Sequence, residues 1–205
     1  MSLGERAAVE GVLSELKPSL AVEIGTAEGA SLARIAEHSR EVHAFDLEPP
    51  GRAPAANVTL HLGDSHELLP RFLAELGERG RGVDFALVDG DHTAEGVRQD
   101  VADLLDSPAV DGTVILVHDT ANEEVRRGLD SILFTDWPAV THVELDWVPG
   151  QLFREPRLRN QVWCGLGLVL VGLPPPARSI DAVYQQSYYE AAHILARERG
   201  RLEGA

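Results

Sequence analysis

The chain has 205 residues, of which 44% are hydrophobic and 25% charged, a composition typical of a globular domain large enough to bury a core. Its net charge is −15 and it has no basic stripe, so a phosphate backbone would be repelled and nucleic acid is excluded as an expected partner. The single cysteine, Cys164, excludes an internal disulfide and a thiolate metal cluster, and no apolar stretch approaches the ~20 residues of a membrane span.

Short apolar runs alternate with segments of helical periodicity along the chain. In chain order, we expect helices at Glu5–Leu16, Ala30–His38, His66–Leu76, Ala94–Leu105, Glu123–Phe134 and Asp181–Arg199. We expect strands at Leu20–Ile24, Val42–Phe45, Val58–Leu62, Phe85–Val88, Val114–Val117, Val140–Leu145 and Gly165–Val171. The middle strands are almost entirely apolar, which is typical of strands buried on both faces. The alternation predicts an α/β fold with a doubly wound, mostly parallel sheet, whose ligands bind beyond the carboxyl ends of the strands.

A glycine turn that contains Gly25 and Gly29 follows the first predicted strand. Gly25 can adopt a positive φ, and Gly29 has no Cβ to obstruct a ligand. Asp46 follows the second strand, 21 residues after Gly25 and close to the spacing of ~20 at which a carboxylate reaches ribose hydroxyls. An adenosine-containing cofactor is therefore expected. The alternative is a tight turn with no ligand, with Asp46 as a helix cap or a solvated acid.

Two residues near this turn favour S-adenosylmethionine (SAM) over a nicotinamide dinucleotide. Glu23 places a carboxylate there, which disfavours a bare pyrophosphate and suits the ammonium of a cofactor that carries an amino acid. Ala27 occupies the second glycine position of the G-x-G-x-x-G pattern. After the third strand, Asp64 is a candidate acceptor for the adenine amino group, with Ser65 beside it. The alternative is that either residue caps the helix that begins near His66.

The sharpest local signal is a pair of clusters that contain acids and histidines. Asp89, Asp91 and His92 follow the fourth strand, and His118 and Asp119 follow the fifth. Adjacent parallel strands would bring both clusters to one edge. Carboxylates suit Mg²⁺, the histidines also permit Mn²⁺ or Zn²⁺, and a bound cation would prepare a substrate hydroxyl whose proton a histidine removes. The alternatives are Asp91 as a helix cap and His118 as a core histidine bonded to a backbone carbonyl.

With these residues, the chain resembles a class I SAM-dependent methyltransferase, and more narrowly the methyltransferase-24 family. That family carries a run like Asp89-Gly90-Asp91-His92-Thr93-Ala94-Glu95-Gly96-Val97 and, further on, a run like His118-Asp119-Thr120. The resemblance covers Ala21–Thr120 and implies a seven-stranded sheet with an antiparallel last strand. Related macrolide-sugar and catechol-type O-methyltransferases hold Mg²⁺ with acids at the positions of Asp89, His118 and Asp119. Here His118 replaces a carboxylate.

The residue patterns and the resemblance together give three groups of candidate residues. The expected cofactor-binding residues are Glu23, Gly25, Thr26, Gly29, Ser31, Asp46, Leu47, Gly63, Asp64, Ser65 and Asp89. The expected metal ligands are Asp89, His118 and Asp119. The expected catalytic residues are Asp89 and His92, with His92 as the base. Candidates for an acceptor pocket, which ordinary packing and solvation explain equally well, are Trp147, Phe153, Arg154, Arg157, Arg159 and Trp163.

We therefore expect an enzyme of secondary metabolism that transfers a methyl group from SAM to a hydroxyl of a small molecule, such as a sugar or phenol, with help from Mg²⁺ or another divalent cation. A non-catalytic SAM-binding or scaffold protein and an NAD-dependent oxidoreductase stay open as alternatives. One domain is expected over residues 1–205, with an N-terminal helical cap at 1–18 and a C-terminal helix at 180–200 that supports a homodimer. The first residues lack the layout of a signal peptide, which predicts a cytoplasmic protein without a membrane partner.

Overall fold

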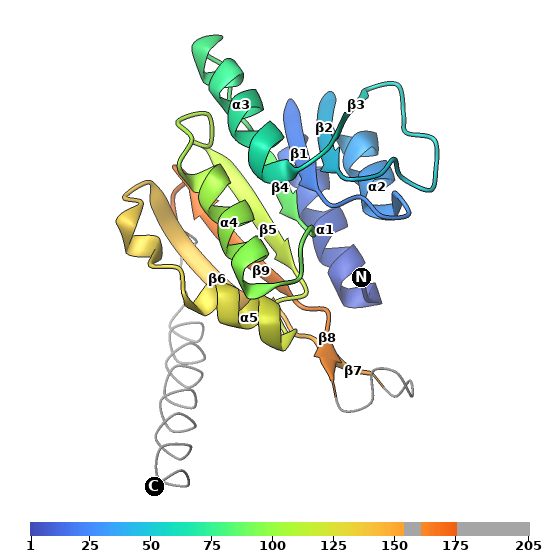
Figure 1. The fold of residues 1–205 in the computed structure, drawn as a ribbon, viewed down its shortest axis with the longest axis vertical. Coiled ribbons are helices and arrows are strands. Elements are labelled where there is room, and N and C mark those ends of the chain that lie inside the picture. The colour runs from blue at the N-terminus through green and yellow to red at the C-terminus, as the bar shows by residue number, and fades with distance from the viewer. Residues whose placement is uncertain (154–160, 176–205) are drawn as a thin grey trace, which may run out of the picture. The chain divides into compact units, whose positions relative to one another are not determined.

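The computed structural model describes residues 1–153 and 161–175 of the chain. Its main sheet has seven strands in the order β3-β2-β1-β4-β5-β9-β6 (Figure 1). The strands from β3 to β5 pair in parallel, whereas β9 is antiparallel to both of its neighbours, β5 and β6. The predicted α/β fold, with a mostly parallel sheet and an antiparallel last strand, is therefore confirmed.

The elements have the following bounds. The strands are β1 (Leu20–Ile24), β2 (Glu41–Asp46), β3 (Val58–Leu62), β4 (Phe85–Val88), β5 (Thr113–His118), β6 (Val140–Val148), β7 (Gln151–Leu152), β8 (Val162–Trp163) and β9 (Leu166–Val171). The helices are α1 (Leu3–Leu16), α2 (Ala30–His38), α3 (Ser65–Glu78), α4 (Ala94–Leu105) and α5 (Glu123–Asp130), with one 3-10 turn, η1 (Phe134–Asp136).

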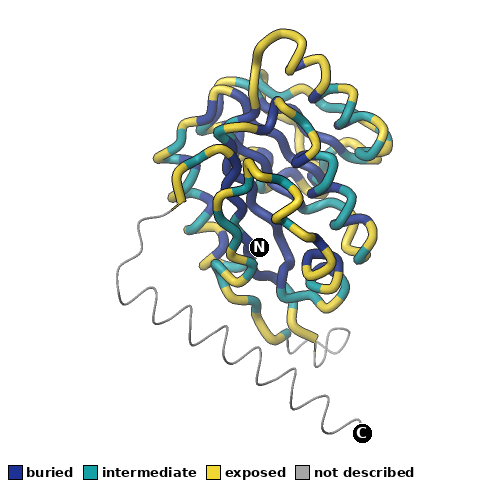
Figure 2. The backbone as a smooth tube through the Cα atoms, turned by 90° about the vertical axis from the view of Figure 1, so that its left-hand side faces the viewer, coloured by how far each residue is buried: buried dark blue, intermediate teal, exposed yellow. Residues whose placement is uncertain are grey.

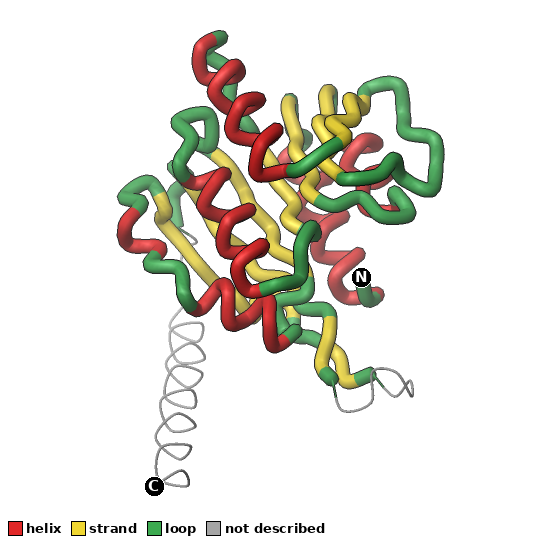
Figure 3. Tube along the Cα trace, in the orientation of Figure 1, coloured by secondary structure: helices red, strands yellow, loops and turns green. Residues whose placement is uncertain are grey.

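Helices cover both faces of the sheet, and the sequence decides which side chains face which layer (Figure 3). Side chains alternate along a strand, so Val22 and Ile24 of β1 join the core formed with α3, α4 and α5, whereas Ala21 joins the core formed with α1 and α2. The same alternation places Glu23 on the side of α1 and α2. Figure 2 shows the buried backbone running through the middle of the described residues.

The helices begin where side chains cap them. Ser2, Asp64, Thr93 and Asn122 each accept a hydrogen bond from a backbone N–H of the first turn that follows. These caps fix the starts of α1, α3, α4 and α5. Three of these starts, those of α3, α4 and α5, lie at the same edge of the sheet as the carboxyl ends of the parallel strands, because each helix follows such a strand.

Most differences between the expected and the observed elements concern the residue at which a helix or strand begins or ends. The helix predicted at Glu123–Phe134 ends at Asp130, and η1 follows it. The small sheet formed by β7 and β8 was not expected from the sequence.

The chain divides into the compact units Met1–Pro174 and Pro175–Ala205. The expected C-terminal helix at 180–200 and residues Arg154, Arg157 and Arg159 lie outside the described residues. Within the described parts, no helix is sufficiently long and apolar to span a membrane.

Gly25 marks the point where the turn after β1 meets the end of β4. Its φ is +82°, and a Cβ at this position would lie 2.0 Å from the backbone oxygen of Asp89. Gly80 also has a positive φ, +64°, but a Cβ there would meet nothing within 4 Å. The two glycines therefore separate the effect of backbone conformation from the effect of close packing.

We predict that Gly25→Ala lowers the free energy of unfolding by about 2–5 kcal/mol, because left-handed strain and steric overlap act together. The control Gly80→Ala carries the strain alone and should lose about 1–2 kcal/mol. Chemical denaturation of both variants measures the difference. Equal losses would show that the turn and the end of β4 are not packed as described.

Candidate functional site

The ends of β4 and β5 bring the two predicted clusters together. Val88 of β4 pairs with Val117 of β5, so the residues that follow each strand lie side by side. His118 is the last residue of β5, and Asp119 follows it in the left-handed conformation, with φ +56°. Such strain in a residue other than glycine is often found at functional sites. Asp119 Oδ1 accepts a hydrogen bond of 2.7 Å from the Cys164 N–H, which anchors this conformation.

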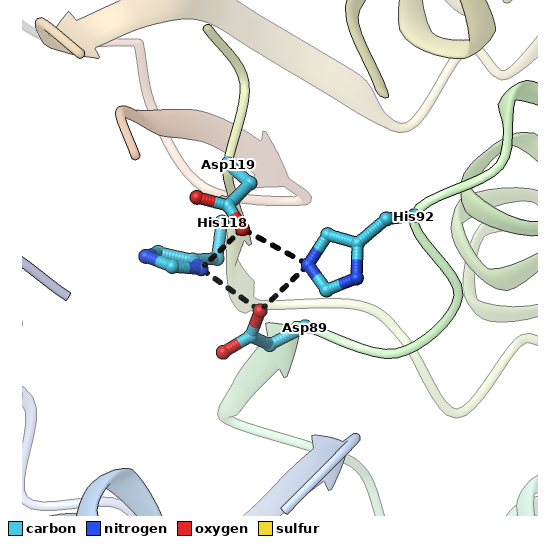
Figure 4. Close-up of side chains that lie close together, drawn as sticks. All are labelled: Asp89, His92, His118 and Asp119. Atoms are coloured by element: carbon cyan, nitrogen blue, oxygen red, sulfur yellow. Dashed lines mark hydrogen bonds and ion pairs between the residues drawn. The ribbon is translucent and has the colours of Figure 1, made fainter. Parts of the chain in front are cut away.

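Four side chains point toward one another at this edge (Figure 4). His118 Nδ1 lies 2.8 Å from Asp89 Oδ1 and 3.5 Å from Asp119 Oδ2. His92 Nε2 lies 2.9 Å from the same Asp119 oxygen and 3.5 Å from the same Asp89 oxygen. The cluster of Asp89, His92, His118 and Asp119 is therefore a closed ring in which nitrogen and oxygen atoms alternate.

The acids and histidines of the cluster shift one another's pKa values. Contacts with Asp119 and then Asp89 raise the pKa of His92 to about 10. Burial lowers the pKa of His118, but contacts with Asp89 and Glu5 outweigh it and raise the pKa to about 9. Burial raises the pKa of Asp89, whereas the two histidines bring it below its usual range. Without a cation, the acids of the cluster thus favour the charged form of both histidines.

The same four atoms fit a divalent cation. They all lie within 4.8 Å of one another, and bonds of 2.0–2.1 Å in a tetrahedral site separate neighbouring ligand atoms by about 3.3 Å. The mixed nitrogen and oxygen donors suit Mn²⁺ or Zn²⁺ better than Mg²⁺, which prefers oxygen alone. The sequence placed His92 beside the metal ligands as a base, and the structure places it within the ring itself.

The structure adds two residues that the sequence did not single out for this site. Glu5, from the expected N-terminal cap, is fully buried. Its Oε1 contacts His118 Nε2, the imidazole nitrogen that does not face Asp89 and Asp119. Cys164 lies close enough that Glu5, His118 and Cys164 form a second group of candidate ligands. Burial raises the pKa of the Cys164 thiol to about 11, which keeps it protonated. No local motif could have revealed Glu5 as a site residue, because its partners in the site, His118 and Gly165, are remote in the chain.

On the cofactor side, Glu23 is a buried carboxyl group without a hydrogen bond among the described residues. It is 0% exposed, and both of its side-chain oxygens lack a partner within hydrogen-bonding geometry. Burial raises its pKa to about 8, with Ser31 opposing the shift and the charges of Asp89 and Asp46 adding to it. A buried acid without a partner is the feature that a cationic ligand group would satisfy.

Asp46 holds the glycine turn in place. Its Oδ2 accepts hydrogen bonds from the Thr26 N–H at 2.7 Å, the Thr26 hydroxyl at 2.8 Å and the Ala27 N–H at 3.2 Å. Its Oδ1 accepts one from the Glu48 N–H at 3.2 Å. Burial raises the pKa of Asp46, but these bonds outweigh it and leave the pKa below its usual range. The expected contact with ribose stays a prediction.

Two leucines are exposed at the ends of β2 and β3. Leu47 is 76% exposed and Leu62 is 52% exposed. Leu62 pairs with Asp46, and the Gly63 N–H donates to the Asp46 carbonyl, so the two strand ends lie together. The expected contact of Leu47 with the cofactor stays a prediction, and Leu62 is not among the residues expected from the sequence.

Asp64 and Ser65 come after β3 in the chain, close to these strand ends. Asp64 caps α3 by accepting a hydrogen bond of 2.9 Å from the His66 N–H, which is the structural alternative that the sequence left open. The Ser65 hydroxyl donates to Asp100 Oδ1 at 3.1 Å. Their expected contacts with adenine are untested. Gly29 begins α2 with φ +74°, and a Cβ there would lie 3.2 Å from Pro50.

Comparisons with known proteins bear on the family and the fold. Residues 22–120 match the model of the Methyltransf_24 family, described as a methyltransferase domain, which confirms the resemblance expected from the sequence. Among curated proteins no match is found.

Solved structures of the same fold include the following three chains. The chain is similar to cofactor-bound Rv0187 from MTB, with 17% identity, coverage of 84% of this chain and 81% of that chain, and a TM-score of 0.60. For an O-methyltransferase from Bacillus cereus in complex with SAH, these values are 14%, 83%, 82% and 0.56. For the MycE methyltransferase from the mycinamycin biosynthetic pathway, in complex with Mg, SAH and mycinamycin VI, they are 14%, 81%, 49% and 0.53. At these identities the likeness shows the fold.

The raised pKa of Glu23 predicts a specific dependence of stability on pH. The folded state favours the protonated carboxyl, so this stabilisation is complete below pH 4.5 and is lost as the pH rises toward 8. Over that range we expect the wild type to lose stability relative to Glu23→Gln, with a limiting slope of about 1.4 kcal/mol per pH unit. Urea unfolding at several pH values measures it. The exposed acid of the same turn provides the control Glu28→Gln, which should run parallel to the wild type. A parallel curve for Glu23→Gln as well would contradict the assignment.

Proposed function

We propose that the chain, whose residues 22–120 match the Methyltransf_24 family, is a class I SAM-dependent methyltransferase that methylates a hydroxyl of a small molecule with help from a divalent cation. The observation that carries this proposal is the ring of Asp89, His92, His118 and Asp119 at the carboxyl edge of β4 and β5. It lies on the same edge as the glycine turn after β1, so cofactor and cation sites are neighbours.

The unpartnered carboxyl group of Glu23 supports binding of the amino-acid portion of SAM. The ammonium group of SAM would supply the hydrogen bonds and the positive charge that the buried carboxyl lacks. The same carboxyl disfavours a dinucleotide, because a pyrophosphate at this turn would meet negative charge. SAM is therefore proposed to place its amino acid near Glu23 and the turn formed by Gly25 and Thr26.

The exposed leucines support a place for the adenosine portion. Leu47 and Leu62 leave apolar surface at the ends of β2 and β3, where an adenine ring can cover it. Asp46 already binds the turn through Oδ2, and its Oδ1 accepts a single hydrogen bond from the protein. We assign that oxygen to the ribose hydroxyls. Asp64, Gly63 and Ser65 would then border the adenine.

In the proposed reaction, this chain's residues align the acceptor and remove its proton. The sulfonium of SAM already provides a good leaving group, so alignment is the main requirement. Asp89, His118 and Asp119 would hold a divalent cation, which, when bound, lowers the pKa of a coordinated hydroxyl. His92 is 41% exposed, the most exposed of the four side chains, so an acceptor can reach it. We assign His92 as the base for the state in which a bound cation would neutralise Asp89 and Asp119, which otherwise hold His92 protonated, or as a fourth ligand if the acceptor loses its proton elsewhere.

Aromatic surface beside His92 supports a ring-bearing acceptor. The ring of Trp163 lies 6.0 Å from the His92 ring, measured between centroids. Trp163 belongs to β8, which pairs with β7 in the small second sheet. A tryptophan face binds the apolar faces of sugar and phenol rings well. The acceptor is therefore proposed to lie between Trp163 and His92, with its hydroxyl toward Asp89 and Asp119.

The test of this proposal is methyl transfer by variants of the cluster. Asp119→Ala should keep SAM binding, because the contacts of the Asp119 carboxylate are with Cys164, His92 and His118 and not with the glycine turn, but should lower turnover about 100-fold or more. Asp119→Asn keeps an oxygen for the Cys164 N–H and should lose turnover as well. Formation of S-adenosylhomocysteine (SAH) with a panel of sugars and phenols, in the presence of Mn²⁺ or Mg²⁺, measures turnover.

The matched control is Asp91→Ala. Asp91 is an exposed acid on the loop between β4 and α4, two residues after Asp89, and its carboxylate accepts hydrogen bonds from Thr93, so this variant should keep its turnover. Undiminished turnover in Asp119→Ala would contradict the site. SAM binding by the wild type without product from any acceptor would favour a non-catalytic SAM-binding protein.

A further inference from the structure

The N-terminal helix contributes a buried acid to the cluster. Glu5 lies in the first turn of α1 and is 0% exposed. One of its oxygens, Oε2, accepts a hydrogen bond from the Ser2 N–H and completes the capping box of the helix. Capping needs only this oxygen. The other oxygen, Oε1, is directed away from the helix and into the site.

Glu5 Oε1 makes two contacts at the centre of the molecule. It accepts a hydrogen bond of 2.6 Å from the Gly165 N–H, 160 residues along the chain, and it lies 3.3 Å from His118 Nε2. The distance to His118 is that of an ion pair, although the geometry does not meet that of a hydrogen bond. His118 Nε2 is itself buried and has no other partner among the described residues.

The two nitrogens of His118 therefore face different carboxylates, three in all. Nδ1 faces Asp89 and Asp119 in the ring, whereas Nε2 faces Glu5. A histidine that binds a metal usually donates its other N–H to a carboxylate or a carbonyl, which fixes its tautomer and its orientation. Burying a carboxylate is unfavourable by several kcal/mol unless it is paired, and helix packing alone would be better served by an apolar side chain.

Glu5 also fixes the turn that follows Trp163, the residue proposed to contact the acceptor. The Gly165 N–H binds Glu5, and the neighbouring Cys164 N–H binds Asp119, so two carboxylates hold one turn. Cys164 in this turn has φ +65°, a conformation that needs such support. Trp163, which faces His92, is the next residue toward the N-terminus.

We propose that Glu5 is a positioning residue, which holds the His118 ring with Nδ1 toward Asp89 and Asp119 and the Nε2–H toward α1. The part of this inference that concerns the metal rests on the proposed function, whereas the orientation of the ring does not. The N-terminal helix is then a component of the site, and loss of its carboxylate loosens both His118 and the turn at Gly165.

The test uses the full chain and three variants. Glu5→Ala removes the carboxylate, and Glu5→Gln keeps one acceptor oxygen and similar size, which provides a second variant if Glu5→Ala folds poorly. The control is Glu10→Ala, which removes another glutamate of α1 whose partner is a histidine, His38, at 2.9 Å. His38 has no part in the cluster. Thermal unfolding establishes that each variant is folded.

The first readout is the NMR signal of the His118 Nε2–H in the metal-free protein, assigned with His118→Asn. We expect a signal protected from solvent exchange in the wild type and in Glu10→Ala, its loss in Glu5→Ala, and partial protection in Glu5→Gln. A signal that stays protected in a folded Glu5→Ala, or that is absent from the wild type, overturns the proposal.

The second readout is binding of Co²⁺, a coloured probe for the cation site. We expect Glu5→Ala to bind Co²⁺ about 10–100-fold more weakly than the wild type and Glu10→Ala, with an altered visible spectrum. A thiolate-to-cobalt band in the wild type would place the metal between Glu5, His118 and Cys164 and overturn the proposal. If the wild type binds no Co²⁺, the metal part of the proposed function fails, and the NMR result decides the role of Glu5.

Discussion

The contact between His118 and Asp89 is the interaction on which the rest of the site depends. It joins the ends of β4 and β5 at 2.8 Å and brings four ionisable side chains into one ring. Four acidic groups, those of Glu5, Glu23, Asp89 and Asp119, lie near these strand ends, and among the described residues two histidines, His92 and His118, contact three of them. The arrangement is stable because each carboxylate except Glu23 has a donor. Glu23 is thus the acid that a cationic ligand would complete.

Parallel pairing explains why these residues meet. In a parallel sheet every strand delivers its carboxyl end to the same edge, so Gly25, Asp46, Asp89 and His118 converge although they are far apart in the chain. Gly25 permits the first turn to lie against the backbone of Asp89, where a side chain would not fit. The electrostatic site and the glycine turn are therefore two results of the same topology, with the helices that follow the strands bordering both.

The sequence predicted the fold, and the edge of the sheet at which the acids and histidines gather, because both depend on local signals. Apolar strands such as Phe85–Val88 end in acids or glycine, and this pattern is readable without tertiary information. The roles of single residues were less accessible. Asp46 supports the turn, and Asp64 caps α3, as local rules allow but do not require. Glu5 was invisible as a site residue, because its partner Gly165 is 160 residues away and only the folded chain joins them.

The central claim is that this edge binds SAM beside a divalent cation. Calorimetric titration of the protein with SAH, with Mn²⁺ present and again after treatment with EDTA, tests it most directly. The account predicts micromolar binding of SAH in both conditions, because Glu23 and the glycine turn need no metal. It also predicts a separate heat of binding when Mn²⁺ is titrated into the EDTA-treated protein after the EDTA has been removed. Absence of heat for SAH in both conditions would contradict the claim and leave only the fold.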